Sequence, residues 1–200
     1  MTTSLELRQI EDLVTRVDAQ LIRPGGRIVG FIASGRGEGT TTLARAYATT
    51  LITHLRKRVV LLTASDQGTV TPGVLPALVA DQPLDGCLQA FAGSGFIGSL
   101  GGQQAGDVLW ELLAVESLWQ DLRSRFDEVV LDLPASSMSR LGLMTAPHCD
   151  GVVVVIEAEK TRAPVAENLI DSLRLVRANV LGTVLNRRRF YLPKRVYRWL

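Results

Sequence analysis

Apolar residues recur along the chain in short uninterrupted runs, separated by longer stretches in which apolar positions have helical spacing. The runs fall at residues 28–32, 59–62, 129–131, 152–156 and 180–185. Short apolar runs of this kind are typical of strands that are buried on both faces of a parallel sheet. We therefore predict five central strands.

Helical spacing characterises the segments between and before these runs. The first such segment has capping-box spacing from Thr3 to Glu6 and ends at Pro24. Its apolar positions are Ile10, Leu13, Val14, Val17 and Leu21. Further helices are expected at residues 42–55, 108–126 and 164–176, and only loops with one or two short helices at residues 69–106. Strands alternating with helices predict an α/β fold, a parallel β-sheet flanked by helices.

A glycine-rich turn follows the first predicted strand and precedes a predicted helix. It comprises Ser34 to Thr41 and contains Gly37, Glu38 and Gly39. Such a turn directs backbone N–H groups and the positive end of the helix dipole toward one point, where phosphate is the usual ligand. In the pattern G-x-x-x-x-G-K-[ST], Ser34 takes the first position and Gly39 the sixth. We call residues 34–41 the phosphate loop.

The phosphate loop lacks its lysine. Thr40 stands at the lysine position, whereas Thr41 keeps the hydroxyl that ligates Mg²⁺ in this motif. Thr42 follows as the third threonine, and Arg36, within the loop, is the cation considered for the phosphate charge. These residues predict descent from a nucleotide-binding loop, with ATP or ADP and Mg²⁺ bound weakly or no longer bound.

The loop and three later segments resemble the kinase domains of bacterial tyrosine kinases that control capsule and exopolysaccharide synthesis. Those domains belong with the MinD/ParA-type P-loop ATPases. Residues 33–42 match Ser-x-x-Pro-Gly-Glu-Gly-Lys-Ser-Thr, with Arg36 for the proline and Thr40 for the lysine. Residues 126–134 resemble the Walker B segment, and residues 150–155 and 181–187 resemble two later strands of the family. The resemblance covers about residues 5 to 190.

The resemblance implies roles for individual residues. Asp132 matches the Walker B aspartate, a metal-shell and candidate catalytic residue, and Thr41 matches the Mg²⁺ hydroxyl. Asn186 matches an asparagine that contacts the adenine base. Gly37, Glu38, Gly39, Thr40 and Thr42 complete the implied nucleotide-binding set.

Several features of the family are absent from the sequence. Thr63 and Ser65 stand where a second strand carries two aspartates, and Asp66 is one residue out of register. The MinD-type signature lysine would fall near Gly35. The family's oligomerisation motif E-x-x-R-x-x-R is not reproduced, and the only tyrosines of the tail are Tyr191 and Tyr197. These losses favour a degenerate enzyme.

The organisation expected from these motifs is one domain of 200 residues, with an N-terminal helix in 1–23, a P-loop core in 27–186 and a tail in 187–200. Six of the fourteen tail residues are basic and four are aromatic. Such a tail suits docking on an anionic membrane face or an acidic partner, and a final helix packed on the domain is the alternative. A net charge of +2 does not indicate a nucleic-acid partner.

Other residues are expected to be structural. Cys87 and Cys149 suggest buried thiols, His54 and His148 lack ligand-like neighbours, and Trp119 has the helical spacing of a core residue, as does Trp110. The N-terminal residues do not resemble a signal peptide, and no apolar stretch reaches about 18 residues. We expect a cytoplasmic protein, held at the inner membrane through a partner.

The sequence leaves three functional hypotheses. The first is a degenerate tyrosine-kinase-like subunit that regulates exopolysaccharide or capsule biosynthesis or export through a membrane-bound chain-length or co-polymerase protein, with a homo-oligomer as a further expectation. The second is an active ATP-dependent tyrosine autokinase or ATPase with an atypical Walker A loop. The third is a MinD/ParA-type positioning protein, against which the missing signature lysine argues.

Overall fold

A computed structural model of the protein describes residues 7–22, 24–64, 72–102, 111 and 113–187. The predicted features that lie outside these ranges are the capping pair Thr3 and Glu6, the strand-end residues Ser65 and Asp66, Trp110, and the tail beyond Arg187.

Seven strands form one sheet in the order β3-β4-β2-β5-β1-β6-β7. Their bounds are Arg27–Ala33 (β1), Val59–Thr63 (β2), Leu88–Phe91 (β3), Gly95–Ser99 (β4), Glu128–Asp132 (β5), Gly151–Glu157 (β6) and Val180–Asn186 (β7). Every pairing is parallel except the antiparallel β3–β4 hairpin. The mostly parallel sheet predicted from the sequence is therefore confirmed.

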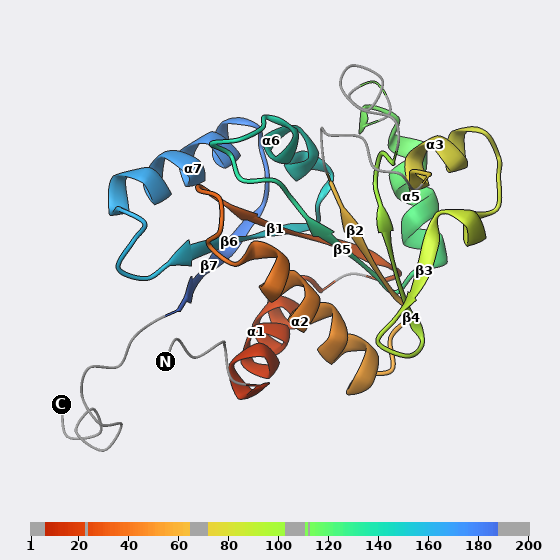
Figure 1. Ribbon diagram of the computed structural model, residues 1–200, viewed down its shortest axis with the longest axis horizontal. Coiled ribbons are helices and arrows are strands. Elements are labelled where there is room, and N and C mark those ends of the chain that lie inside the picture. Colours follow the sequence, from red (N-terminus) through yellow and green to blue (C-terminus); the bar gives the residue numbers. More distant parts are fainter. Residues whose placement is uncertain (1–6, 23, 65–71, 103–110, 112, 188–200) are drawn as a thin grey trace.

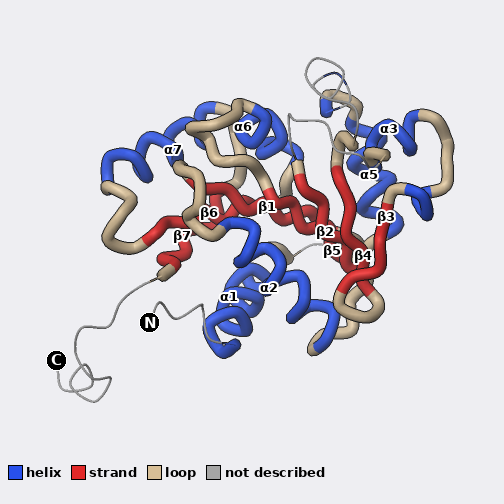
Figure 2. Tube along the Cα trace, viewed as in Figure 1, coloured by secondary structure: helices blue, strands red, loops and turns tan. Residues whose placement is uncertain are grey.

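Helices cover both faces of this sheet, so the described residues form three layers (Figure 1 and Figure 2). The helices α1 (Leu7–Gln20) and α2 (Thr40–Thr53) lie on one face. The other face carries α3 (Val74–Val79), α5 (Glu116–Arg125), α6 (Leu141–Thr145) and α7 (Ala163–Leu175), with short 3₁₀ helices at Leu84–Gly86 (η1) and Ala146–His148 (η2).

The central strands are buried on both faces because their alternate side chains enter two separate cores. In β1, Ile28 and Ile32 pack toward α5 and α6, whereas Val29 and Phe31 pack toward α1 and α2. Phe31 contacts Tyr47 of α2 with ring centroids 5.2 Å apart. This two-sided burial explains why the strands read as continuous apolar runs in the sequence.

The structure corrects the sequence prediction in two regions. Residues 69–106, expected to hold only loops and short helices, also contain the β3–β4 hairpin. Its strands are short and its second strand carries Gly95 and Gly98, so no apolar run marked it. The predicted helix 108–126 is interrupted: Glu111 and Leu113 are helical, Val115 is extended, and α5 begins at Glu116.

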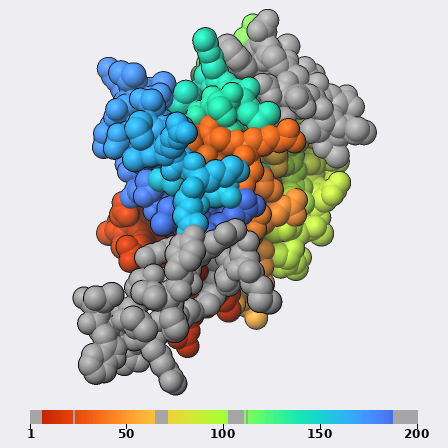
Figure 3. Space-filling view, turned by 60° about the vertical axis from the view of Figure 1, so that its left-hand side comes forward, coloured from red at the N-terminus to blue at the C-terminus, as the bar shows by residue number. Residues whose placement is uncertain are grey.

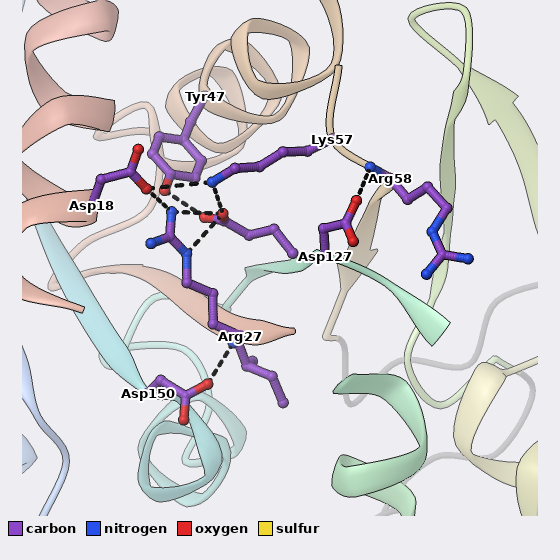
Figure 4. A network of polar contacts seen from close by, with 9 residues as sticks. Asp18, Arg27, Tyr47, Lys57, Arg58, Asp127 and Asp150 are labelled. Atoms are coloured by element: carbon purple, nitrogen blue, oxygen red, sulfur yellow. Dashed lines mark hydrogen bonds and ion pairs between the residues drawn. The ribbon is translucent and has the colours of Figure 1, made fainter. Parts of the chain in front are cut away.

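A network of charged and polar side chains joins the layers at the edge of the sheet opposite the phosphate loop (Figure 4). Glu128, fully buried at the start of β5, accepts hydrogen bonds from Arg27 Nε at 2.8 Å and from Tyr47 Oη at 2.5 Å. Lys57 Nζ lies 3.3 Å from the same carboxylate, and Asp18 of α1 pairs with both Arg27 and Lys57. The network ties α1 to the sheet.

Candidate functional site

The phosphate loop lies between the end of the central strand β1 and the start of α2. Gly37 and Gly39 have φ angles of 83° and 98°, which residues with a side chain rarely adopt. Leu43 N donates to Gly39 O at 3.0 Å, so the amides of residues 40–42 precede the first intrahelical hydrogen bond. Amides at a helix N-terminus form a ready site for an anion. The phosphate-binding role of this turn stays a prediction.

The start of α2 is joined to the end of β5 by one side-chain hydrogen bond. Thr41 Oγ1 donates to Asp132 Oδ2 at 2.7 Å. Burial raises the pKa of Asp132, whereas the Thr41 hydrogen bond and the charge of Arg45 lower it. The structure thus brings together the two residues predicted to hold Mg²⁺, and a hydroxyl beside a carboxylate is oxygen chemistry that suits this ion.

Glu38 braces the loop from within. Its Oε1 accepts hydrogen bonds from Ser34 Oγ and Gly35 N, both at 2.8 Å, and the residue is only 5% exposed. Its other carboxylate oxygen is buried and, within the described part of the chain, has no hydrogen-bond partner. A Cβ on Gly35 would lie 2.8 Å from Glu38 Oε1, so the carboxylate fills the space beside the position of the MinD-type signature lysine.

The segment after β5 and the end of β7 hold the loop in place. From the segment after β5, Ser136 N donates to Ala33 O at 3.0 Å and Ser137 N donates to Ser34 O at 3.1 Å. From β7, Asn186 Nδ2 donates to Glu38 O at 2.8 Å. In the space-filling view, the orange surface of the early chain lies between the teal segment that follows β5 and the blue segments around β6 and α7 (Figure 3).

Thr63, one of the two residues that stand where the family has aspartates on a second strand, lies directly beside Asp132. Thr63 is the β2 partner of Asp132 in the β2–β5 register. Its side chain carries no charge, so of this described pair of strand ends only Asp132 carries a carboxylate, where the resemblance implies more. Ser65, at the other aspartate position, lies outside the described residues.

The cations near the loop differ from the prediction, which considered Arg36 alone. Arg36 is exposed, and Arg45 is the cation whose charge acts on the pKa of Asp132. Arg45 lies one helical turn after Thr41, and its guanidinium is 5.9 Å from the ring centre of Phe91. The i, i+4 spacing from Thr41 was the sequence signal that would have identified it.

The remaining candidates occupy structural positions. Both cysteines are buried, as predicted, and Trp119 is fully buried, with its ring stacked on His148 at 4.8 Å. His54 pairs with Glu11 at 3.1 Å. The described ranges contain no group of three or more His, Cys, Asp or Glu residues arranged for a metal ion. Among the described helices, none has both the length and the apolar character to cross a bilayer.

Solved structures share this architecture over most of the chain. The kinase domain of the Escherichia coli tyrosine kinase ETK superposes with a TM-score of 0.77 at 16% identity, covering 94% of this chain and 79% of that one. The kinase domain of VpsO superposes with a TM-score of 0.69 at 24% identity, covering 91% and 97%. The septum site-determining protein MinD of Pyrococcus horikoshii OT3, solved in complex with Mg-ADP, gives 0.62 at 14% identity, covering 86% and 76%.

The chain has the fold of a MinD/ParA-like P-loop NTPase. A curated relative adds a sequence match: the succinoglycan biosynthesis transport protein ExoP of Rhizobium meliloti (strain 1021) is 34% identical over 74 residues. That match covers 37% of this chain and 9% of ExoP, so the chain spans less than a tenth of this relative. No family model matches the chain. The resemblance to polysaccharide tyrosine kinases predicted from the motifs is confirmed by these neighbours.

Proposed function

We propose that this protein is a P-loop subunit of exopolysaccharide or capsule biosynthesis or export, and that it regulates the process without phosphoryl transfer. The observation that carries the proposal is the Thr41–Asp132 hydrogen bond of 2.7 Å beside an uncharged Thr40. The helix amides suit a phosphate group, and Thr41 and Asp132 suit Mg²⁺, so the loop retains the parts that bind.

The parts that accelerate phosphoryl transfer are reduced. A lysine at position 40 would place a unit charge against phosphate, worth roughly 4 kcal/mol at about 4 Å and an effective dielectric near 20. If that interaction forms in the transition state, its loss costs on the order of three decades in rate. Thr63 stands beside Asp132 at a position where the resembled family has a second carboxylate. Because phosphoryl transfer depends on positioning and charge stabilisation, both changes act on the same step.

The cofactor in this proposal is ATP or ADP with Mg²⁺, bound weakly. The residues that would hold the phosphates are the amides of residues 37–42, and Thr41 and Asp132 would hold the ion. Binding of the nucleotide would act as the regulatory signal, since a ligand that binds one conformation better than another shifts the population toward it. MinD of Pyrococcus horikoshii, solved with Mg-ADP, supports this choice of ligand.

The relatives support the biological process and the partner that we propose. ExoP is named for succinoglycan biosynthesis and transport, and it is far longer than this chain. We infer a membrane-bound chain-length or co-polymerase protein as the partner, contacted by the basic and aromatic tail of residues 187–200. With about 1 kcal/mol per basic residue near an anionic surface, the charge of this segment suffices for salt-sensitive recruitment at the inner membrane face.

A titration and a turnover assay on the same preparation test the proposal. We expect calorimetry to give weak, Mg²⁺-dependent binding of ATP and ADP, and no ATP hydrolysis or tyrosine autophosphorylation above that of Thr41→Ala. Tight binding with turnover would instead identify an active autokinase or ATPase. For the partner, deletion of residues 188–200 should release the protein from anionic vesicles or partner-containing membranes; unchanged co-sedimentation would contradict that part.

A further inference from the structure

Asn186, the last residue of β7, uses both ends of its side-chain carboxamide inside the protein. Its Nδ2 donates to Glu38 O of the phosphate loop at 2.8 Å, and its Oδ1 accepts from Arg187 N at 2.9 Å. The two partners fix the orientation of the amide, because a carbonyl requires the NH₂ group and a backbone N–H requires the oxygen. Asn186 is 7% exposed, and its hydrogen bond to Glu38 O is buried.

The backbone of Asn186 is held as firmly as its side chain. Its carbonyl accepts from Ala158 N at 2.9 Å, and it pairs with Glu157 in the β6–β7 register. The residue that follows, Arg187, has a φ of 56° and donates from Nη1 to Glu157 Oε1 at 3.0 Å. The donor aimed at the loop therefore projects from a fixed point of the sheet.

Contacts on the loop side match this arrangement. A Cβ on Gly39 would lie 2.0 Å from Asn186 Nδ2, so only glycine leaves room for the carboxamide. Glu38, whose carbonyl receives the hydrogen bond, also directs its carboxylate to Ser34 and Gly35 at the other end of the loop. Glu38 is thus held by β7 through its backbone carbonyl, and its side chain in turn holds the beginning of the loop.

We propose that Asn186 is a positioning residue of the phosphate loop, which acts on a bound phosphate through Glu38 and not through contact with a base. The identity of the bound phosphate ligand rests on the proposed function, whereas the effect of Asn186 on the loop conformation does not. The hydrogen bond keeps the turn at residues 37–39 in place, so that the amides ahead of α2 stay directed at one point. Its loss lets the Glu38 carbonyl turn, and the amides of the neighbouring peptides turn with it.

The distinction between loop positioning and base recognition is measurable with a ligand that has no base. We would titrate the full-length protein with Mg²⁺-ADP and with Mg²⁺-pyrophosphate, using the natural sequence, Asn186→Ala, Asn186→Asp and Asn179→Ala. Asn179 is the matched control: it immediately precedes β7, and its Nδ2 donates to a backbone carbonyl, that of Asp150, at 2.7 Å. That hydrogen bond lies at the opposite end of the sheet.

The expected result is that Asn186→Ala weakens both ligands by the same factor, about tenfold, since a buried carbonyl loses its donor. Asn186→Asp keeps the shape but faces Glu38 O with an oxygen, so it should weaken both ligands at least as much. Asn179→Ala should leave both affinities unchanged. Weaker binding of ADP with unchanged binding of pyrophosphate would identify Asn186 as a base contact and overturn the proposal, as would unchanged affinity for both.

Hydrogen–deuterium exchange of the amides of residues 35–41 gives a second measurement that needs no ligand. Exchange should be about tenfold faster in Asn186→Ala than in the natural sequence or in Asn179→Ala, with strand β1 unaffected. Equal exchange in all three proteins would overturn the loop-positioning role. If neither ligand binds the natural sequence, the proposed nucleotide function fails, and this exchange experiment still decides the role of Asn186.

Discussion

Thr41 at the start of α2 and Asp132 at the end of β5 are joined by a hydrogen bond of 2.7 Å, although 91 residues separate them in the sequence. The bond sits at the carboxyl edge of the sheet, where parallel α/β folds bind their ligands. It brings together the two residues to which the resemblance assigns Mg²⁺ binding, at the start of a helix whose loop carries Thr40 in place of the lysine.

Restoring the loop lysine should strengthen binding without restoring turnover. We expect Thr40→Lys to raise the affinity for Mg²⁺-ATP at least tenfold, because a charge-assisted hydrogen bond contributes about 1.5–3 kcal/mol. ATP hydrolysis should appear only when Thr63→Asp is added, since Thr63 is the sheet partner of Asp132. Calorimetry and phosphate release measure the two effects. Thr53→Lys, at the far end of α2, controls for added charge; full turnover from Thr40→Lys alone would contradict the role given to Thr63.

Removing the charge of Asp132 should stabilise the protein at neutral pH. Burial raises the pKa of this carboxyl above its ordinary value of 3.8, so the ionised form costs stability at higher pH and the cost vanishes below pH 3.8. Asp132→Asn can still accept the Thr41 hydrogen bond. We expect its Tm to exceed that of the natural sequence by a few degrees at pH 7 and the difference to shrink toward pH 4. A difference that grows on acidification would reverse the assigned sign.

Breaking the buried ionic network should destabilise the fold strongly. Burial alone would lower the pKa of Arg27, but the Glu128 charge and its hydrogen bonds raise it overall, which marks a tightly paired guanidinium. Arg27→Met leaves the Glu128 carboxylate buried without its main partner and should cost about 3–5 kcal/mol in urea unfolding. Asp18→Asn changes a side chain that is 39% exposed and should cost about 1 kcal/mol. Equal losses for the two variants would show that burial of Glu128 does not decide the effect.

Acidification should weaken the packing of α5 on η2. Burial lowers the pKa of His148, which stacks on Trp119; the Glu116 carboxylate raises it and Arg123 lowers it. A lowered histidine pKa contributes stability above the ordinary value of 6.5, and that stability is lost as the pH falls through the lower folded-state value. NMR titration should place the His148 midpoint below 6.5. His148→Gln should reduce the loss of stability between pH 7 and pH 5. His54→Gln should show the same loss as the natural sequence.

Both thiols should be unreactive while the protein is folded. Cys149 and Cys87 are buried, and burial raises the pKa of each thiol, so the reactive thiolate is scarce at neutral pH. We expect a thiol reagent such as DTNB to label neither cysteine in buffer and both in denaturant. The labelling rate should follow the fraction unfolded across a urea titration. Rapid labelling of either residue in buffer would contradict its burial.

The apolar pattern alone predicted most of the fold. Five strands and the helices α1, α2 and α7 appear where the sequence indicated them, because strands buried on both faces need continuous apolar runs and half-buried helices need spaced ones. The β3–β4 hairpin was missed for the same reason. Its strands are only partly buried, so they need no continuous run of apolar residues that would mark them in the sequence.

For the site, the sequence determined which chemical groups are present, and the tertiary structure decided how they are used. The glycines, threonines and Asp132 could be read from local motifs, because a strand–turn–helix motif is a local arrangement. That Thr63 lies beside Asp132 and that Arg45 affects its pKa follow from sheet register and helix packing. The hydrogen bond from Asn186 to Glu38 joins residues 148 positions apart. They meet only because the folded chain places the end of β7 beside the phosphate loop.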